Sequence, residues 1–263
     1  MKIAVIGCGN MGGAIARSLA MDEEFSKANE ISVSNRTQAK LDALKSQFPC
    51  VEISTDNKEV VKDADMVVFA VKPWLLETVA KEVRDEMTAS QIVISVVAGK
   101  TFEELANLFT IDWKQCPLFR VIPNTAIAIG QSMTVISQCG ATDEQVALVQ
   151  SLFDKSGKTL LVEERLMNPA MALCSCGTAY ALRYIRAAVE GGVELGLTPK
   201  QAQMLVGQTV IGAASLLEAN DSHPEAEIDK VTTPGGLTIK GLNKMEACGF
   251  TNAVIEGLKE NVK

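Results

Sequence analysis

A glycine-rich segment near the start of the chain has the spacing of a phosphate-binding loop. It reads Gly7-Cys8-Gly9-Asn10-Met11-Gly12, a G-x-G-x-x-G pattern that directly follows the apolar run Lys2–Ile6. In that context we expect a strand, a tight turn and a helix whose first N–H groups bind a pyrophosphate. Gly9 leaves room for the phosphates, so the segment from Ile6 to Gly12 predicts dinucleotide binding. A glycine turn without a ligand, or a flavin site, would have the same pattern.

The end of the second expected strand indicates which dinucleotide is bound. Ser34, Asn35 and Arg36 stand where an NAD enzyme usually has an acid that accepts hydrogen bonds from the ribose hydroxyls. A guanidinium instead offers a planar fork of donors to phosphate oxygens. We therefore expect Arg36 to bind the 2′-phosphate of NADP, with NADPH preferred and NADH as the alternative cofactor. A solvated surface arginine is the other interpretation.

Two further segments end strands at the same edge of the expected sheet. They are Ala70-Val71-Lys72-Pro73 and Val97-Ala98-Gly99. Ligands of open parallel sheets lie beyond the carboxyl ends of the strands, so we expect both segments to contact the cofactor. Lys72 has a second interpretation, as a residue that only caps its loop. Asn124, which follows another expected strand, is predicted to orient a substrate or to form an ordinary Pro-Asn turn.

The sharpest chemical feature of the second half is a hydroxyl-rich turn before a helix. It reads Val231-Thr232-Thr233-Pro234-Gly235-Gly236-Leu237-Thr238. The turn exposes N–H groups at a helix N-terminus, which favours a carboxylate ligand. We expect this segment to bind the carboxylate of a small-molecule substrate. A helix start without a ligand is the alternative.

The elements that must position these residues alternate between strands and helices in the first half. The expected strands are Lys2–Ile6, Glu30–Ser34, Met66–Val71, Gln91–Val97, Phe119–Ile122 and Lys158–Val162. The expected helices are Asn10–Ala20, Thr37–Phe48, Trp74–Met87, Thr101–Phe109 and Thr142–Ser156. This alternation predicts a parallel sheet covered by helices, and the continuous apolar runs suit strands that are buried on both faces.

The second half has no strand pattern. Long helices are predicted at Asn168–Leu195 and Thr198–Ala219, and both are apolar nearly all round. A helix that is apolar on every face must be buried on every face, so we infer that the two helices pack against a second copy of the chain. The sequence therefore predicts an α/β protein. A Rossmann-type dinucleotide-binding domain at 1–163 is followed by an all-α dimerisation domain at 164–263.

Composition narrows the class of protein. The chain has 263 residues, of which 47% are apolar, and a net charge of −7. That charge argues against nucleic-acid binding and against an anionic membrane surface. Neither a signal peptide nor a run long enough to span a bilayer is apparent, so we expect a cytoplasmic protein. The seven cysteines contain no C-x-x-C pair and His223 is the only histidine, so we expect free thiols and no metal site.

Taken together, these motifs resemble the pyrroline-5-carboxylate reductase family over the whole chain. The matching segments are VIGCGNMGGAI at the start, FAVKP at 69–73, RVIPNT at 120–125 and VTTPGGLTIKGL at 231–242. The resemblance implies reduction of the cyclic imine Δ1-pyrroline-5-carboxylate to L-proline by NAD(P)H, the last step of proline biosynthesis. It also implies a homodimer whose substrate pocket lies between the Rossmann domain and both helical domains. Some members form decamers of five dimers.

The resemblance also implies residues near the substrate. The family commonly has SGSGPAY where this chain has Cys174 to Tyr180, so Ser175 and Thr178 are its counterparts of substrate-binding positions. An imine is electrophilic once its nitrogen is protonated, so the enzyme must chiefly align it with the nicotinamide. We expect Thr238 to be the catalytic residue, through a hydrogen bond with the ring nitrogen.

Two other functions fit the same outline. A β-hydroxyacid dehydrogenase shares the two-domain plan but uses a lysine from the first long helix of the second domain. Residues 168–195 contain no lysine. A catalytically silent NADP-binding regulatory protein is the other alternative, because the expected chemistry requires little of the side chains. An assay of imine-dependent NADPH oxidation separates all three.

Overall fold

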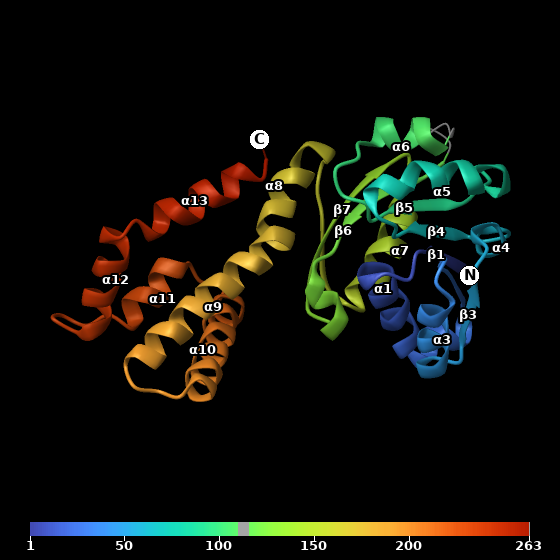
Figure 1. Cartoon of the computed structure of the whole chain (residues 1–263). Helices are drawn as coiled ribbons and strands as arrows, with labels where there is room; N and C mark the ends of the chain where they lie inside the picture. Colours follow the sequence, from blue (N-terminus) through green and yellow to red (C-terminus); the bar gives the residue numbers. More distant parts are fainter. Residues whose placement is uncertain (110–115, 263) are drawn as a thin grey trace. The chain divides into compact units, whose positions relative to one another are not determined.

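The computed structural model describes residues 1–109 and 116–262, in two compact units (Figure 1). The first unit is Met1–Ser175 and the second is Cys176–Lys263. The boundary expected after residue 163 therefore lies inside the first unit. Met167 is fully buried there with Ile122 and Val135 of the sheet, so the first turns of the long helical segment pack on the sheet.

Among the described residues, eight strands form one sheet in the first unit, in the order β3-β2-β1-β4-β5-β6-β7-β8. The strands are β1 (Lys2–Ile6), β2 (Glu30–Ser34), β3 (Val51–Ser54), β4 (Met66–Phe69), β5 (Ile92–Ser95), β6 (Leu118–Ile122), β7 (Ser132–Cys139) and β8 (Gly157–Leu161). Strands β1 to β6 are parallel, β7 runs antiparallel to β6, and β8 is parallel to β7. The carboxyl ends of six strands therefore meet at one edge, where ligands of such sheets lie.

Two apolar clusters cover the two faces of this sheet. Successive side chains of a strand point to opposite faces, so Ile3 and Val5 enter one cluster while Ala4 and Ile6 enter the other. The first cluster includes α1 (Asn10–Met21), α3 (Gln38–Gln47) and α7 (Asp143–Asp154). The second includes α4 (Asn57–Val61), α5 (Leu76–Val83) and α6 (Phe102–Phe109). Burial on both faces explains why the parallel strands are continuous apolar runs.

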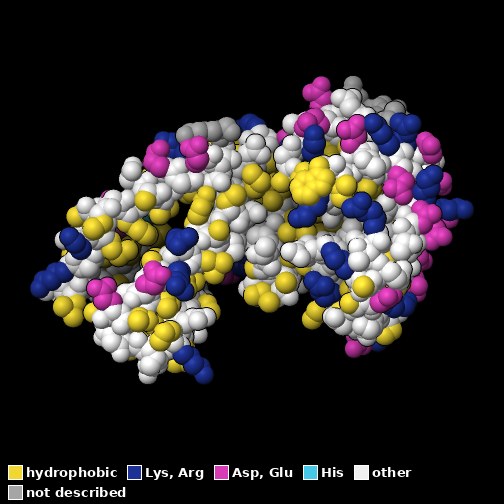
Figure 2. Space-filling view, viewed as in Figure 1, with side chains coloured by type: hydrophobic (Ala, Val, Ile, Leu, Met, Phe, Trp, Pro, Cys, Tyr) yellow, Lys and Arg dark blue, Asp and Glu magenta, His cyan; other side chains and the backbone are white. Residues whose placement is uncertain are grey.

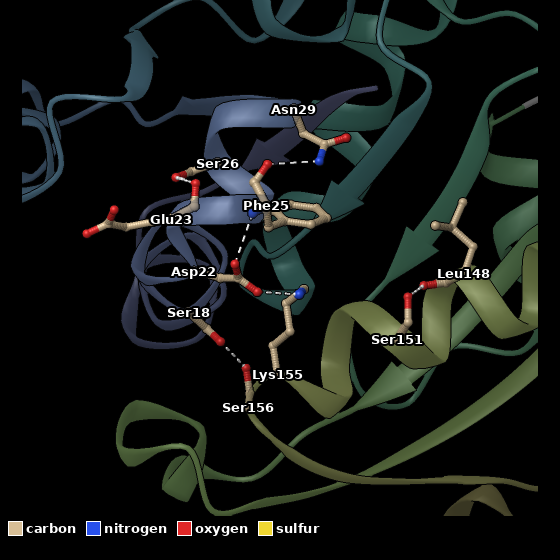
Figure 3. Close-up of polar contacts among 10 residues, drawn as sticks. All are labelled: Ser18, Asp22, Glu23, Phe25, Ser26, Asn29, Leu148, Ser151, Lys155 and Ser156. Atoms are coloured by element: carbon tan, nitrogen blue, oxygen red, sulfur yellow. Dashed lines mark hydrogen bonds and ion pairs between the residues drawn. The ribbon is translucent and has the colours of Figure 1, made fainter.

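Polar contacts join α7 to the end of α1. The carboxylate of Asp22, just after α1, pairs with the ammonium of Lys155 at a distance of 2.5 Å, and Ser18 bonds to Ser156 (Figure 3). The same carboxylate accepts from the N–H of Phe25 and so caps α2 (Glu23–Ala28). The hydrogen bond with Lys155 holds the pKa of Asp22 below its ordinary value.

The second unit is helical throughout its described residues. Its helices are α9 (Gly177–Glu194), α10 (Pro199–Asn220), α11 (Pro224–Lys230), α12 (Leu237–Ala247) and α13 (Phe250–Glu260). Helices α9 and α10 lie side by side (Figure 1). Upstream of α9 are α8 (Met167–Met171) and a π-helical segment, Ala172–Cys176. The single helix expected at 168–195 is therefore interrupted by a wider turn.

Apolar side chains are exposed over much of the second unit. Figure 2 shows hydrophobic side chains spread over its helices. Large apolar residues with exposed side chains on α10 include Met204, Leu205, Ile211 and Leu216. None of the described helices combines the length and the apolar character that crossing a membrane requires.

The structure confirms most expected elements and corrects several. Strand β3, the short helices α2 and α4, and the antiparallel strand β7 were not expected from the sequence. The helix expected at Trp74–Met87 is shorter, because a 3-10 turn at Pro73–Leu75 precedes α5. The capping box predicted from Thr142 and Gln145 is present at the start of α7. No disulfide joins any of the seven cysteines, all of which lie in the part of the chain that the structure describes.

Candidate cofactor and substrate sites

The three glycines of the first loop have different environments. A Cβ added to Gly12 would lie 1.9 Å from the carbonyl oxygen of Gly7, and one added to Gly7 would lie 2.6 Å from that of Ala70. Gly7 also has a φ of 104°, which side chains rarely adopt. A Cβ on Gly9 would meet nothing within 4 Å. Gly7 and Gly12 are therefore required by the packing of the loop, whereas Gly9 borders open space.

A cleft of about 900 Å³ lies beside this loop. Most of the residues predicted to bind the cofactor line it: Ile6, Gly7, Gly9, Asn10, Met11, Asn35, Arg36, Ala70, Val71, Lys72, Pro73, Val97 and Ala98. Cys8, Gly12, Ser34 and Gly99 do not line it. The structure thus brings the loops after β1, β2, β4 and β5 together around one space. Among the described residues, no side chain caps α1, whose N-cap is Gly9, so its first N–H groups can bind an anion.

Cationic side chains line the cleft beyond those expected from the sequence. Arg36 and Lys72 were expected, and Arg17 and Lys40 were not. A signal exists for Arg17 in helix periodicity, because Arg17 is seven residues after Asn10 on α1 and therefore on the same side of that helix. The four cations and the open helix N-terminus suit a ligand that carries several phosphates. The residues present therefore fit a phosphorylated dinucleotide.

Cys8 and Asn35 hold two of the cleft loops together. The N–H of Cys8 donates to Oδ1 of Asn35 at 3.2 Å, and the N–H of Gly7 donates to the carbonyl of Ser34 at 2.9 Å. The thiol of Cys8 is buried, and burial raises its pKa. Cys8 is therefore a packed, protonated side chain under the loop, and Asn35 links the loops after β1 and β2 as well as lining the cleft.

A half-buried ion pair supports the loop after β5. The guanidinium of Arg120, on β6, lies 2.8 Å from the carboxylate of Glu164. The same carboxylate oxygen accepts from the N–H of Phe102 at 2.7 Å, at the start of α6. Arg120 belongs to the RVIPNT segment, and no role was expected for it from the sequence. The pair fixes one end of the segment that carries Val97 and Ala98.

Asn124 lies in a buried hydrogen-bond network. Its Oδ1 accepts from the N–H of Ala126 at 2.9 Å, and its Nδ2 donates to the carbonyl of Cys174 at 3.1 Å. The carbonyl of Cys174 belongs to the π-helical segment. The structure therefore gives Asn124 two structural contacts, and its predicted contact with substrate remains a prediction.

The hydroxyl-rich turn lies in the second unit, just before α12. Gly236 is the N-cap of α12, and the N–H of Gly236 donates to the carbonyl of Thr233 at 2.9 Å. Gly235 has a φ of 69°, so the turn depends on a glycine there. Thr232 donates its hydroxyl to the carbonyl of Asp229 at 3.1 Å. Thr238 is the second residue of α12, and its side chain is exposed.

The remaining predicted substrate residues are distributed between the units. Ser175 is half-buried at the end of the first unit, and Thr178 is half-buried in the first turn of α9. Val231 precedes the turn and has an exposed side chain. Among the described residues of the second unit, the turn 232–236 and Thr238 lie within one segment at the start of α12.

Comparison with protein families gives two matches that follow the two halves of the chain. Residues 164–263 match the family described as pyrroline-5-carboxylate reductase dimerisation. Residues 2–99 match the family described as NADP oxidoreductase, coenzyme F420-dependent. The first match begins close to α8, and the second covers the glycine loop and the strands that border the cleft.

Whole-chain relatives carry the same description. Pyrroline-5-carboxylate reductase 1 of Dictyostelium discoideum is 37% identical over 97% of this chain, which spans only 48% of that relative. Pyrroline-5-carboxylate reductase 2 of the same organism is 36% identical over 98% of this chain and 89% of the relative. The solved structure of a pyrroline-5-carboxylate reductase from Coxiella burnetii superimposes with a TM-score of 0.90 at 28% identity, covering 99% of this chain and 96% of that one.

Proposed function

The chain belongs to the pyrroline-5-carboxylate reductase family, and on that premise we propose that it reduces L-Δ1-pyrroline-5-carboxylate to L-proline with NADPH. The observation that supports this most directly is the cleft in the first unit, which is lined by the N-terminus of α1 and by four cations. A chain with a single histidine suits this reaction, because a protonated imine needs little acid or base chemistry.

The first unit binds the cofactor in this proposal. The N–H groups at the start of α1 hold the pyrophosphate, Gly9 leaves the space for it, and Arg36 contacts the 2′-phosphate. NADPH, when bound, supplies the hydride. Lys72, Val97 and Ala98 line the part of the cleft after β4 and β5, where small side chains admit a nicotinamide ribose.

The second unit binds the substrate. The backbone of the turn 232–236 and the N-terminus of α12 hold the carboxylate, which a helix N-terminus favours. The hydroxyl of Thr238 accepts a hydrogen bond from the iminium N–H and stabilises the charged, reactive form of the imine. Val231 and Thr178 of the second unit, and Asn124 and Ser175 of the first, are the further residues that we assign to substrate binding.

The proposed assembly is a homodimer of a cytoplasmic enzyme. The match to a dimerisation domain and the exposed apolar side chains of the second unit support association between copies. A decamer of five dimers is the larger assembly to test. Neither nucleic acid nor a membrane is part of the proposal.

A steady-state assay of the purified full chain tests the function. NADPH oxidation that depends on pyrroline-5-carboxylate and forms proline is the expected result. Oxidation of a 3-hydroxy acid with NADP instead of imine reduction would favour the β-hydroxyacid dehydrogenase. Tight NADPH binding without turnover of either substrate would favour a regulatory protein.

A further inference from the structure

A chain of three hydrogen-bonded side chains ends at the wall of the cofactor cleft. The hydroxyl of Ser34, at the end of β2, donates to Oδ1 of Asn57 at 2.7 Å. Nδ2 of Asn57 donates to Oε2 of Glu82 at 3.0 Å. Ser34 and Asn57 are buried, whereas the carboxylate of Glu82 lies at the surface of α5. The proposed cofactor function gives neither of these two hydrogen bonds a purpose.

The hydroxyl of Ser34 fixes the orientation of the Asn57 amide. A carboxamide oxygen only accepts and its nitrogen only donates, so the bond from Ser34 turns the amide nitrogen toward Glu82. An ionised carboxylate only accepts hydrogen bonds. The contact from Asn57 therefore restrains one oxygen of Glu82 and leaves the other able to accept from a ligand.

Glu82 differs in charge from the other ionisable residues of the cleft. The described lining residues include four cations and one acid: Arg17, Arg36, Lys40, Lys72 and Glu82. A phosphate beside Glu82 would be repelled by its carboxylate. The ligand group that this carboxylate can bind is therefore an uncharged donor.

The position of Glu82 selects among the donors of a dinucleotide. Glu82 is on α5, which packs on the opposite face of the sheet from α1 and α3, the helices that carry Arg17 and Lys40. A ribose hydroxyl next to the 2′-phosphate must lie with the cations. The exocyclic amine at the edge of the base lies farther from the phosphate and has two hydrogens to donate.

The wall around Glu82 also suits a flat base. Val79 lines the cleft from α5, three residues before Glu82 and therefore on the same side of the helix. Thr78 and Leu75 line the same wall. A base that packs against Val79 presents its edge toward the carboxylate.

We propose that Glu82, held by Asn57 and Ser34, accepts a hydrogen bond from the exocyclic amine of adenine and makes the cleft selective for an adenine dinucleotide. This inference rests on the proposed cofactor function. The ligand that the cleft should bind less tightly carries hypoxanthine, in which a carbonyl oxygen replaces the amine of adenine. That oxygen would face the carboxylate with no proton between them.

Calorimetric titration with two cofactors tests the assignment. Dissociation constants are measured for NADPH and for reduced nicotinamide hypoxanthine dinucleotide phosphate, with the parent chain, Glu82→Gln and Glu82→Ala. The parent should prefer NADPH by about tenfold, the size of one hydrogen bond to a charged group at an exposed site. Glu82→Gln should bind both cofactors about equally, because an amide can donate to the carbonyl of hypoxanthine or accept from the amine of adenine. Glu82→Ala should also lose the preference.

A matched control lies on the same helix. Glu77 is on α5, pairs with Lys81 at 2.7 Å and does not line the cleft, so Glu77→Gln should keep the parental preference. Equal affinities in the parent chain would overturn the proposal. A preference that survives in Glu82→Ala, or an equal loss of both affinities in Glu82→Gln, would overturn it as well. Each of these outcomes leaves imine reduction by the parent intact, so the failure of this assignment is distinct from a failure of the proposed function.

Discussion

The two units of the chain differ in where their apolar side chains lie. Nearly every buried apolar residue belongs to the first unit, and Ala202 is the only one beyond Ser175 among the described residues. Two methionines make the contrast concrete. Met21 of the first unit is 71% exposed and Met204 of the second is 69% exposed. Met21 ends a helix of a unit with a complete core, whereas Met204 belongs to a helix with further exposed apolar side chains.

This difference shows that the first unit has a core of its own and the second does not. The sheet of the first unit buries both faces under helices, so its remaining surface can carry a charged cleft. The described helices of the second unit bury only Ala202 fully among their apolar residues. A unit whose apolar helices are not covered has to obtain its core from another copy, which matches the homodimer proposed above.

The largest expected effect comes from placing a charge on each of the two exposed methionines, one variant at a time. The full chain is expected to be at least a dimer at micromolar concentration. Met204→Asp should dissociate or aggregate it, because an unpaired charge buried in an interface costs several kcal/mol. Met21→Asp should leave the assembly unchanged. Light scattering measures the oligomeric state of the parent chain and of both variants. A stable monomer of the parent chain would refute the proposed association through the second unit.

The next largest effect is expected in the first unit alone. Gly9→Val should abolish measurable NADPH binding, because the added side chain fills the space that the pyrophosphate needs. The variant should fold and keep the parental oligomeric state, since nothing lies within 4 Å of a Cβ at Gly9. Calorimetric binding and light scattering test the two halves of this prediction. Unchanged NADPH affinity in the folded variant would remove the dinucleotide assignment.

Thr238→Ala should separate the substrate role of the second unit from the cofactor role of the first. Removal of the hydroxyl should lower kcat/KM for the imine by about 10- to 100-fold, since hydrogen bonds to charged groups contribute about 1.5–3 kcal/mol. NADPH affinity should not change. Thr238→Ser should retain most activity as the matched control. If Ser fails as badly as Ala, or if Ala matches the parent, the hydroxyl does not hold the imine nitrogen.

Arg36→Ala tests whether this side chain contacts the 2′-phosphate in the cofactor cleft. NADPH affinity should fall by about 10- to 100-fold through loss of the contact to the 2′-phosphate, and NADH affinity should be spared. The lower end of that range is the expected one, because Lys40 lines the same cleft and retains part of the positive charge. Equal losses for both cofactors would show that Arg36 does not contact the 2′-phosphate.

The smallest effect concerns a surface contact of the first unit. Asp22→Asn keeps the cap on α2 but loses the ion pair with Lys155, so Tm at neutral pH should decrease slightly. The folded-state pKa of Asp22 is lowered, so its stabilisation is present above its ordinary pKa and is lost as the pH falls through the lowered value. The difference in Tm between parent and variant should therefore vanish in acid. A difference that persists there would mean that the ion pair is not its cause.

The sequence predicted the parallel strands well, because strands buried on both faces leave continuous apolar runs. It missed β7 because Ser132, Thr134 and Ser137 are polar yet buried there. Ser132 and Thr134 satisfy each other by a hydrogen bond at 3.0 Å, so burial without an apolar pattern is tolerated. It missed β3 because only Val51 of its four residues is fully buried.

Site residues were predictable where a local motif marks them. The glycine loop and the turn before α12 have such motifs, and the structure places each of them at a helix N-terminus. Asn57 and Glu82 have no local signal, because they meet through the packing of α4 on α5. A contact between residues 25 positions apart depends on tertiary structure, which a pattern within one element does not encode.

The π-helical segment Ala172–Cys176 determines the direction in which the later side chains of α9 point about the helix axis. An α-helix turns by about 100° per residue, so a wide turn with one additional residue rotates all later side chains by about that angle. Deleting one residue here would restore the α-helical repeat and turn every face of α9, even though each amino acid of α9 would be unchanged. The amide of Asn124 donates to the carbonyl of Cys174 and so contacts the backbone within this wide turn. The number of residues in this short segment therefore determines which way each side chain of α9 points, as much as the amino acids themselves do.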